Sequence, residues 1–139
     1  MCIRDRLGVF GAVVFANDND KFAVQTYQAN HTKVMWPDDI AKIDGSAIPD
    51  HDLLTAGFPC QSFSIAGKRS GFDDKRGDLF WHIIRVLDAK KPKWVLLENV
   101  PGLVSIDNGR TFDSIARALT NLGYGFDYKI LNATNYDVP

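Results

Sequence analysis

The sequence predicts an α/β fold with a doubly wound, mostly parallel sheet. Short, largely apolar runs, which are typical of buried parallel strands, alternate along the chain with segments of helical periodicity. The strand-like runs cover residues 13–16, 52–56 and 94–97, and each ends in polar or turn-forming residues. This alternation indicates strand–helix–strand units with right-handed crossovers. The 139 residues are 45% hydrophobic, so one domain with a real core is expected.

Amphipathic segments predict the helices between these strands. The first helix is expected over residues 20–30, with Asp18 or Asn19 as its N-cap. One face of that helix carries Phe22, Ala23 and Tyr27. The second helix is expected over residues 77–89, and its core stripe consists of Leu79, Ile83, Val86 and Leu87.

The remaining segments complete the expected order. A third helix is predicted over residues 109–122, and Gly123 suits its C-cap. Residues 31–51 are loop-like, and residues 65–76 form a long irregular stretch. Loops of that length in compact domains are often functional lids. Residues 124–131 alternate imperfectly between apolar and polar, which predicts a final strand.

Composition and charge limit the class of protein. The net charge is −1, so overall charge does not by itself support DNA binding, although Lys68, Arg69, Lys75 and Arg76 could form a basic patch or simply a solvated loop. No apolar run approaches the ~20 residues of a membrane span, and no signal peptide is visible. The only two cysteines, Cys2 and Cys60, exclude a disulfide framework and a four-cysteine zinc site. A reducing, cytoplasmic setting is expected, and no metal site is predicted.

Cys60 stands directly after the second strand-like run. Gly57 lets the backbone turn or approach a ligand closely, and Pro59 pushes the preceding residue toward an extended conformation. A cysteine most often acts as a small buried hydrophobe. Here the thiol follows the apolar run instead of lying within it, and ligands of open α/β sheets bind beyond the carboxyl ends of the strands. Cys60 is therefore a candidate nucleophile at the rim of the sheet.

Two motifs close the second and third strand-like runs, namely Gly57-Phe58-Pro59-Cys60-Gln61-Ser62-Phe63-Ser64 and Glu98-Asn99-Val100. They resemble the nucleophile motif and the Glu-Asn-Val motif of the bacterial type of DNA (cytosine-5) methyltransferases. The resemblance implies a partial Rossmann-like, S-adenosylmethionine-dependent methyltransferase fold. It implies Cys60 as the nucleophile that adds to C6 of a flipped-out cytosine, Glu98 as the acid at N3, and Pro59 and Asn99 as residues that shape this site. Considered alone, Glu98 would simply mark where the chain reaches the surface.

The same resemblance implies S-adenosyl-L-methionine as the cofactor. Asp18 matches the acid that holds the ribose, and Asn19 stands where the family often has an aromatic that stacks on adenine. Asp39 and Ile40 match the family's Asp-Ile segment, in which the acid can contact the adenine amine. Further cofactor-side positions implied by the family motifs are Phe58, Gly77 and Leu79. Plain alternatives stay open, because Asp18 could only cap a helix and Asp39 could be a solvated turn residue.

Double-stranded DNA is the partner that the resemblance implies. In this family the loop after the nucleophile closes over DNA, and its candidate contact residues here are Gln61, Ser62, Ser64, Lys68 and Arg69. A monomer without a membrane partner is expected. A restriction–modification system, with a cognate restriction endonuclease in the source, is a further expectation.

The resemblance covers only the middle of the family's catalytic domain. Residues 1–6 are polar and aperiodic and are expected to be a non-native leader, and residues 7–139 are expected to be a catalytic domain truncated at both ends. The family's Phe-x-Gly-x-Gly-Gly loop and Gln-x-Arg-x-Arg motif are absent from this sequence. The fragment alone is therefore expected to bind the cofactor weakly and not to methylate.

Three alternatives remain open. A cytosine-5 methyltransferase that acts on transfer RNA shares much of this motif set. A non-catalytic remnant would only bind nucleic acid. A cysteine hydrolase would need a histidine base, and none of the three histidines, His31, His51 and His82, lies in a recognisable partner motif.

Overall fold

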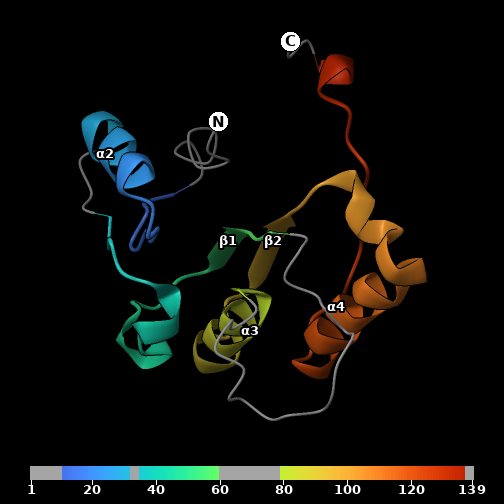
Figure 1. Cartoon of the computed structure of the whole chain (residues 1–139). Coiled ribbons are helices and arrows are strands. Elements are labelled where there is room, and N and C mark those ends of the chain that lie inside the picture. Colours follow the sequence, from blue (N-terminus) through green and yellow to red (C-terminus); the bar gives the residue numbers. More distant parts are fainter. Residues whose placement is uncertain (1–10, 32–34, 60–78, 137–139) are drawn as a thin grey trace. The chain divides into compact units, whose positions relative to one another are not determined.

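The structure is a computed structural model that describes residues 11–31, 35–59 and 79–136. The chain forms two compact units, Met1–Glu98 and Asn99–Pro139 (Figure 1). No helix in the described part of the chain is both long and apolar enough to cross a membrane.

The first unit contains a parallel pair of strands, β1 (Leu53–Gly57) and β2 (Trp94–Glu98), which lie side by side in Figure 1. The strands pair residue for residue, from Leu53 opposite Trp94 to Gly57 opposite Glu98. Helix α3 (Leu79–Lys90) lies in the connection between them, so the segment is a β-α-β unit. This confirms two of the predicted strands and their parallel direction. The doubly wound sheet stays a prediction, because the described residues contain a sheet of two strands only.

Both strands alternate between exposed and half-buried residues. Trp94, Leu96 and Glu98 are exposed on one face of β2, whereas Val95 and Leu97 are half-buried on the other. The prediction that residues 94–97 are buried on both faces is therefore wrong in this structure. The apolar run is long enough to form a strand, but only one face of the pair is covered, and Trp94 remains 62% exposed.

Helix α3 supplies much of the core of the first unit. Phe80 and Leu87 are fully buried, and Ile83 and Val86 are nearly so. Three members of the predicted stripe are thus confirmed, while Phe80 takes the central place expected for Leu79, which is half-buried. The helix ends where Lys91 adopts a left-handed conformation (φ 47°), and Pro92 cannot continue it.

The segment before β1 packs against α3 through two short 3₁₀ helices, η1 (Ile40–Lys42) and η2 (Gly45–Ala47). A cluster of Ile43, Ile48 and Val86 joins the two, with Phe15, Ile40 and Leu54 packed around it. Residues 35–51 are therefore irregular apart from these short helices, as predicted, and apolar contacts anchor them to α3.

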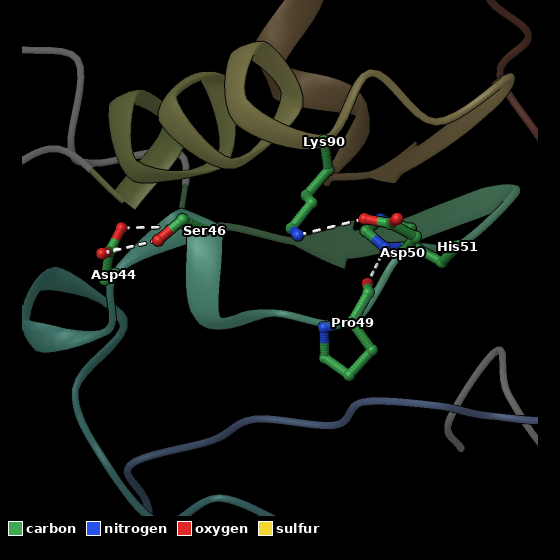
Figure 2. A network of polar contacts seen from close by, with 6 residues as sticks. All are labelled: Asp44, Ser46, Pro49, Asp50, His51 and Lys90. Atoms are coloured by element: carbon green, nitrogen blue, oxygen red, sulfur yellow. Dashed lines mark hydrogen bonds and ion pairs between the residues drawn. The ribbon is translucent and has the colours of Figure 1, made fainter.

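Aspartates cap both 3₁₀ helices. The Asp39 Oδ1 accepts a hydrogen bond from the Ala41 amide at 3.0 Å. Asp44 accepts hydrogen bonds from the Ser46 amide and hydroxyl, as Figure 2 shows. These two bonds, the side-chain bond first, hold the pKa of Asp44 below its usual value. Each short turn is thus stabilised by its own aspartate.

The polar residues of α3 reach the same segment. The Arg85 guanidinium donates to the carbonyl oxygens of Ile40 and Ile43, both at 2.7 Å. Lys90 is the last residue of α3, and its Nζ lies 3.1 Å from an Asp50 carboxylate oxygen (Figure 2). Burial lowers the pKa of His82 below 6.5, Arg85 lowers it further, and Asp39 partly opposes both effects.

Helix α2 (Lys21–Asn30) confirms the first predicted helix, with two corrections. Its N-cap is Asp20, whose carboxylate accepts from the Ala23 amide at 2.7 Å, and not Asp18 or Asn19. Phe22, predicted on the buried face, is 73% exposed. The buried cluster instead consists of Val24, Tyr27 and Met35, with Ala16 packed against it. Tyr27 is buried as predicted, and Val24, which lies three residues before it on the same face, takes the place expected for Phe22.

Residues 13–16 do not form the predicted strand. The backbone makes a single parallel bridge just beyond them, between Asn17 and Trp36. The Trp36 amide donates to the Ala16 carbonyl at 2.9 Å, and the Asp18 amide donates to the Trp36 carbonyl at 3.3 Å. An apolar run becomes a strand only where a neighbour completes its hydrogen bonds, and the described residues offer this run one bridge.

The second unit is built on helix α4 (Arg110–Asn121), which confirms the third predicted helix. It follows η4 (Pro101–Val104) and η5 (Ile106–Gly109), and η6 (Ala133–Tyr136) comes later in the chain. The buried residues of this unit are Leu103, Thr111, Ile115 and Leu119.

Left-handed residues mark both ends of α4. Asp107, Asn108 and Gly109 have φ values of 53°, 54° and 82° just before the helix. Gly123 has φ 90° just after it, as predicted for the C-cap. The Asp107 carboxylate pairs with Arg110, which ties the unusual turn to the first residue of the helix.

Residues 124–131 do not form the predicted final strand. Phe126 and Tyr128 instead pack edge-on against Phe112 of α4, with ring centroids 5.4 and 4.7 Å away. Ile130 and Leu131 are each 60% exposed. The alternating pattern is present, but none of the described residues pairs with this segment as a second strand.

Leu87→Ala is expected to lower the free energy of unfolding by about 2–5 kcal/mol, because the residue is fully buried and its loss leaves a cavity. The measurement is chemical denaturation followed by circular dichroism. Asp88→Ala is the matched control, because Asp88 is the exposed neighbour on the same helix. Equal destabilisation by both changes would contradict the assigned core.

His82 is expected to make the fold less stable as the pH falls. Its folded-state pKa is lowered, so below 6.5 the unfolded chain binds the proton more readily, and stability is lost through the folded pKa. His82→Gln should remove this component, so the wild type should lose stability relative to the variant between pH 7 and pH 5. Parallel curves of unfolding free energy against pH for the two proteins would refute it.

Candidate functional site

The carboxyl ends of β1 and β2 form the core of the candidate site. Gly57 is the last residue of β1 and pairs with Glu98, the last residue of β2. The side chain of Glu98 crosses toward β1, since a Cβ built on Gly57 would lie 3.5 Å from the Glu98 Oε2. The carboxylate therefore lies on the exposed face of the pair, directly beside a residue without a side chain.

The segment after β1 leads from this edge toward the nucleophile position. Phe58 is buried and its ring lies 5.4 Å from that of Phe80, in the first turn of α3. Pro59 is exposed and follows without regular structure. Cys60 lies outside the described residues, and it is bonded to Pro59, three positions after the residue that pairs with Glu98. The described residues therefore lead from the Glu98 edge to Pro59, the residue before the predicted nucleophile.

Asn17 joins the two acidic segments that sequence reasoning assigned to the cofactor. Its Nδ2 donates to the carbonyl oxygens of Trp36 at 3.0 Å and Asp38 at 2.6 Å. The neighbouring residues are Asp18 on one side and Asp39 on the other, so the candidate cofactor acids lie on adjoining stretches of backbone. Sequence reasoning missed Asn17, although a polar residue directly after an apolar run was a usable signal.

Both acids retain carboxylate acceptors that suit hydroxyl and amine donors. The Asp18 Oδ1 accepts from the Asp20 amide at 2.9 Å, and the Asp39 Oδ1 accepts from the Ala41 amide at 3.0 Å. Within the described ranges, the second oxygen of each makes no hydrogen bond that the structure shows. Asp18 is half-buried and Asp39 is exposed. Ribose hydroxyls and an adenine amine are donors, so the donor–acceptor chemistry fits a nucleoside-containing cofactor.

The other proposed cofactor positions are less closely grouped. Asn19 is exposed, and as an asparagine it does not provide the aromatic surface that the family often has at this position. Ile40 is half-buried in the apolar cluster beneath η1, and Leu79 is half-buried at the start of α3. Asn99 belongs to the second unit, where its Oδ1 accepts from the Val100 amide at 2.9 Å. Its predicted place in the pocket stays a prediction.

Several predicted site residues lie outside the described part of the chain. They are Cys60, Gln61, Ser62, Ser64, Lys68, Arg69 and Gly77. Their assigned roles in catalysis, DNA contact and cofactor binding remain predictions.

The histidines do not support a hydrolase. The His51 Nδ1 donates to the Pro49 carbonyl at 2.9 Å (Figure 2), and it precedes β1, whereas Cys60 follows β1. The ring of His31 lies 4.7 Å from that of Tyr27, after α2. His82 lies in α3 near Asp39 and Arg85.

Comparison with known proteins gives several relatives of similar identity. The chain is 46% identical over 127 residues to the Type II methyltransferase M.HhaI of Haemophilus parahaemolyticus, covering 91% of this chain and 38% of that protein. It is 50% identical over 126 residues to M.NgoBI of Neisseria gonorrhoeae, covering 91% and 39%. The values for M.NlaX of Neisseria lactamica are 50% over 126 residues, covering 91% and 40%. The chain therefore spans about two-fifths of the length of these curated relatives.

A family-level match extends over almost the whole chain. The family model described as C-5 cytosine-specific DNA methylase matches residues 5–139. The matched range includes both motif-bearing strands, the Glu98 edge and the Asp18 and Asp39 segments. On this match the chain belongs to the C-5 cytosine-specific DNA methylase family.

Proposed function

We propose that the protein carrying this chain is a DNA (cytosine-5)-methyltransferase. Family membership supports this, and so does one geometric observation. The register sets Gly57 opposite Glu98, so the described backbone runs from the edge that carries the acid to Pro59, the residue before Cys60. In the proposed reaction the nucleophile and the acid act on neighbouring atoms of one pyrimidine ring. The M.HhaI, M.NgoBI and M.NlaX relatives are each named Type II methyltransferases.

The proposed fold is the doubly wound, Rossmann-like sheet of S-adenosylmethionine-dependent methyltransferases. The β1-α3-β2 unit is its natural building block, since parallel strands require a crossover connection. The exposed apolar residues of β1 and β2, such as Leu53 and Leu96, form a face that a second layer of helices would cover. Residues 7–139 would then be part of a longer catalytic domain.

In the proposed reaction Cys60 is the covalent catalyst. Its thiolate adds to C6 of a flipped-out cytosine, and C5 becomes the nucleophile that takes the methyl group. Glu98 donates a hydrogen bond or proton at N3, where negative charge develops during the addition. Loss of the C5 proton then expels the Cys60 thiolate and restores the ring. Pro59 fixes the backbone beside the thiol, and Asn99 shapes the pocket.

The proposed cofactor is S-adenosyl-L-methionine, which when bound supplies an electrophilic methyl group. Asp18 would accept hydrogen bonds from the ribose hydroxyls and Asp39 from the adenine amine. Ile40, Phe58, Gly77 and Leu79 would line the same site. Asn17 would keep the two acids at a fixed spacing through its bonds to Trp36 and Asp38.

The proposed partner is double-stranded DNA, which the protein would bind as a monomer in the cytoplasm. The net charge is −1, so attraction to phosphates must come from a local cluster, for which Lys68 and Arg69 are the candidates. Gln61, Ser62 and Ser64 would contact DNA from the same loop. The relatives are named Type II methyltransferases, which favours a cognate endonuclease in the source, and transfer RNA is the alternative substrate.

Covalent trapping tests the proposed nucleophile. Duplex DNA in which 5-fluorocytosine replaces cytosine should form a denaturation-stable adduct with the complete gene product when S-adenosyl-L-methionine is present, because after methyl transfer the fluorine at C5 cannot leave as the proton would, which blocks the final elimination. Cys60→Ser should abolish the adduct, and Glu98→Gln should slow its formation by roughly 10²–10⁴-fold. The adduct is measured as a shifted band on a denaturing gel.

Asp88→Asn is the control, since Asp88 is an exposed residue of α3 outside the proposed site and should leave trapping unchanged. An adduct that survives Cys60→Ser would refute the assigned nucleophile. Trapping on 5-fluorocytosine transfer RNA but not on duplex DNA would favour the RNA alternative. A protein that binds DNA without any adduct would be a binding module only.

The isolated 139-residue chain is expected not to methylate DNA, because it spans about two-fifths of its relatives. Transfer of a tritiated methyl group to unmethylated duplex is the measurement. A full-length relative such as M.HhaI serves as the positive control. Turnover by the isolated chain would show that it contains a sufficient active site.

A further inference from the structure

We propose that Arg85 is a positioning residue for the cofactor, acting through the Asp39–Ile40 turn. This inference rests on the proposed function, because it assumes that Asp39 contacts the cofactor. Arg85 lies in the middle of α3 and has no place in the motifs on which the family resemblance rests. Its role follows from where its guanidinium ends.

The guanidinium forks across the turn that Asp39 begins. Its Nη2 donates to the Ile40 carbonyl and its Nη1 to the Ile43 carbonyl, each at 2.7 Å. These two carbonyls bracket η1, and the Ile43 amide closes the turn by donating to the Ile40 carbonyl at 3.3 Å. Two charge-assisted bonds from one rigid plane therefore fix both ends of the turn.

The base of the fork is fixed as firmly as its tip. Val86, next to Arg85, packs with Ile43 and Ile48 in one buried cluster. On the adjoining turn, a Cβ built on Gly45 would lie 3.1 Å from the Ala89 Cβ and 3.7 Å from the Arg85 carbonyl oxygen. Gly45 carries no side chain, so this turn can approach α3 more closely than a residue with a Cβ would allow.

The consequence for Asp39 follows from two bonds. Its Oδ1 accepts from the Ala41 amide, inside the turn that Arg85 brackets. On the preceding side, the Asp38 carbonyl accepts from Asn17. The backbone of Asp39 is therefore held from both directions, by Asn17 before it and by Arg85 after it. The remaining carboxylate oxygen is presented in one orientation, which is what selective binding of a cofactor amine requires.

A lysine at position 85 would keep the charge but lose the fork. Its ammonium is a single point donor and cannot bridge two carbonyls with fixed geometry. Arg85→Lys should therefore raise the dissociation constant for S-adenosyl-L-methionine roughly tenfold, as for the loss of one charge-assisted hydrogen bond. The turnover number at saturating cofactor and the dissociation constant for duplex DNA should change less than about twofold, since the two hydrogen bonds of the Arg85 guanidinium go to the carbonyls of Ile40 and Ile43.

The experiment uses the complete gene product that contains this chain. Cofactor affinity is measured by isothermal titration calorimetry, and turnover and DNA affinity are measured on the same preparations. Lys90→Ala is the matched control, because Lys90 is a second cation on α3 whose partner is the highly exposed Asp50. It should leave cofactor affinity unchanged. Arg85→Gln serves as a second test variant if Arg85→Lys does not fold.

A double-mutant cycle separates positioning from general support. If Arg85 acts through Asp39, the double variant Asp39→Asn/Arg85→Lys should bind the cofactor about as weakly as Asp39→Asn alone. Additive losses would overturn the proposal. Equal losses of cofactor affinity, DNA affinity and thermal stability in Arg85→Lys would also overturn it, as would failure of both position-85 variants to fold, because each shows a purely structural role.

Failure of the proposed function gives a different result. In that case the wild type would not bind S-adenosyl-L-methionine, or Asp39→Asn would bind it normally. Weakened binding by Asp39→Asn together with normal binding by Arg85→Lys would leave the proposed function intact and reject only the role of Arg85.

Discussion

The parallel pairing of β1 with β2 fixes the geometry of the candidate site. The two strands come from segments about forty residues apart, yet their last residues, Gly57 and Glu98, lie opposite each other. Because the two strands are parallel and their five residues pair one to one, both strands end at the same edge of the sheet. Gly57 also leaves space at this edge, because a side chain at this position would lie next to the Glu98 carboxylate.

Helix α3 supports both halves of the candidate site at once. Its first turn places Phe80 against Phe58, two residues before Cys60, and its middle places Arg85 against the carbonyls beside Asp39. A single helix thus contacts both Phe58, which leads to the predicted nucleophile, and the turn that follows Asp39, the predicted cofactor acid. The segment before β1 has little regular structure, yet its position against α3 is well fixed. Short aspartate-capped turns and the buried Ile43 cluster anchor it in place of a long helix.

Local sequence predicted those parts of the structure that local sequence determines. The strands at 53–57 and 94–98 and the helices α2, α3 and α4 were found because apolar runs and helical spacing are properties of the segment itself. The strand predictions for residues 13–16 and 124–131 were wrong because a strand also needs a pairing partner, and the residues of the strand itself do not show whether one is present. Asn17 and Arg85 escaped notice for the same reason, since Arg85 contacts a carbonyl 45 residues away. The family match covers the motif residues, and their individual roles stay predictions.

The matched register of the two short strands makes the chain more tolerant of substitution than of changes in length. Exchange of one β-branched or aliphatic residue for another inside β1 or β2 would leave Glu98 opposite Gly57. Insertion or deletion of a single residue within either strand would displace the carboxylate by about 3.3 Å and turn it to the opposite face of the pair. Natural length variation in descendants of this sequence should therefore gather in the connections, and the two five-residue strands should be inherited with their lengths unaltered.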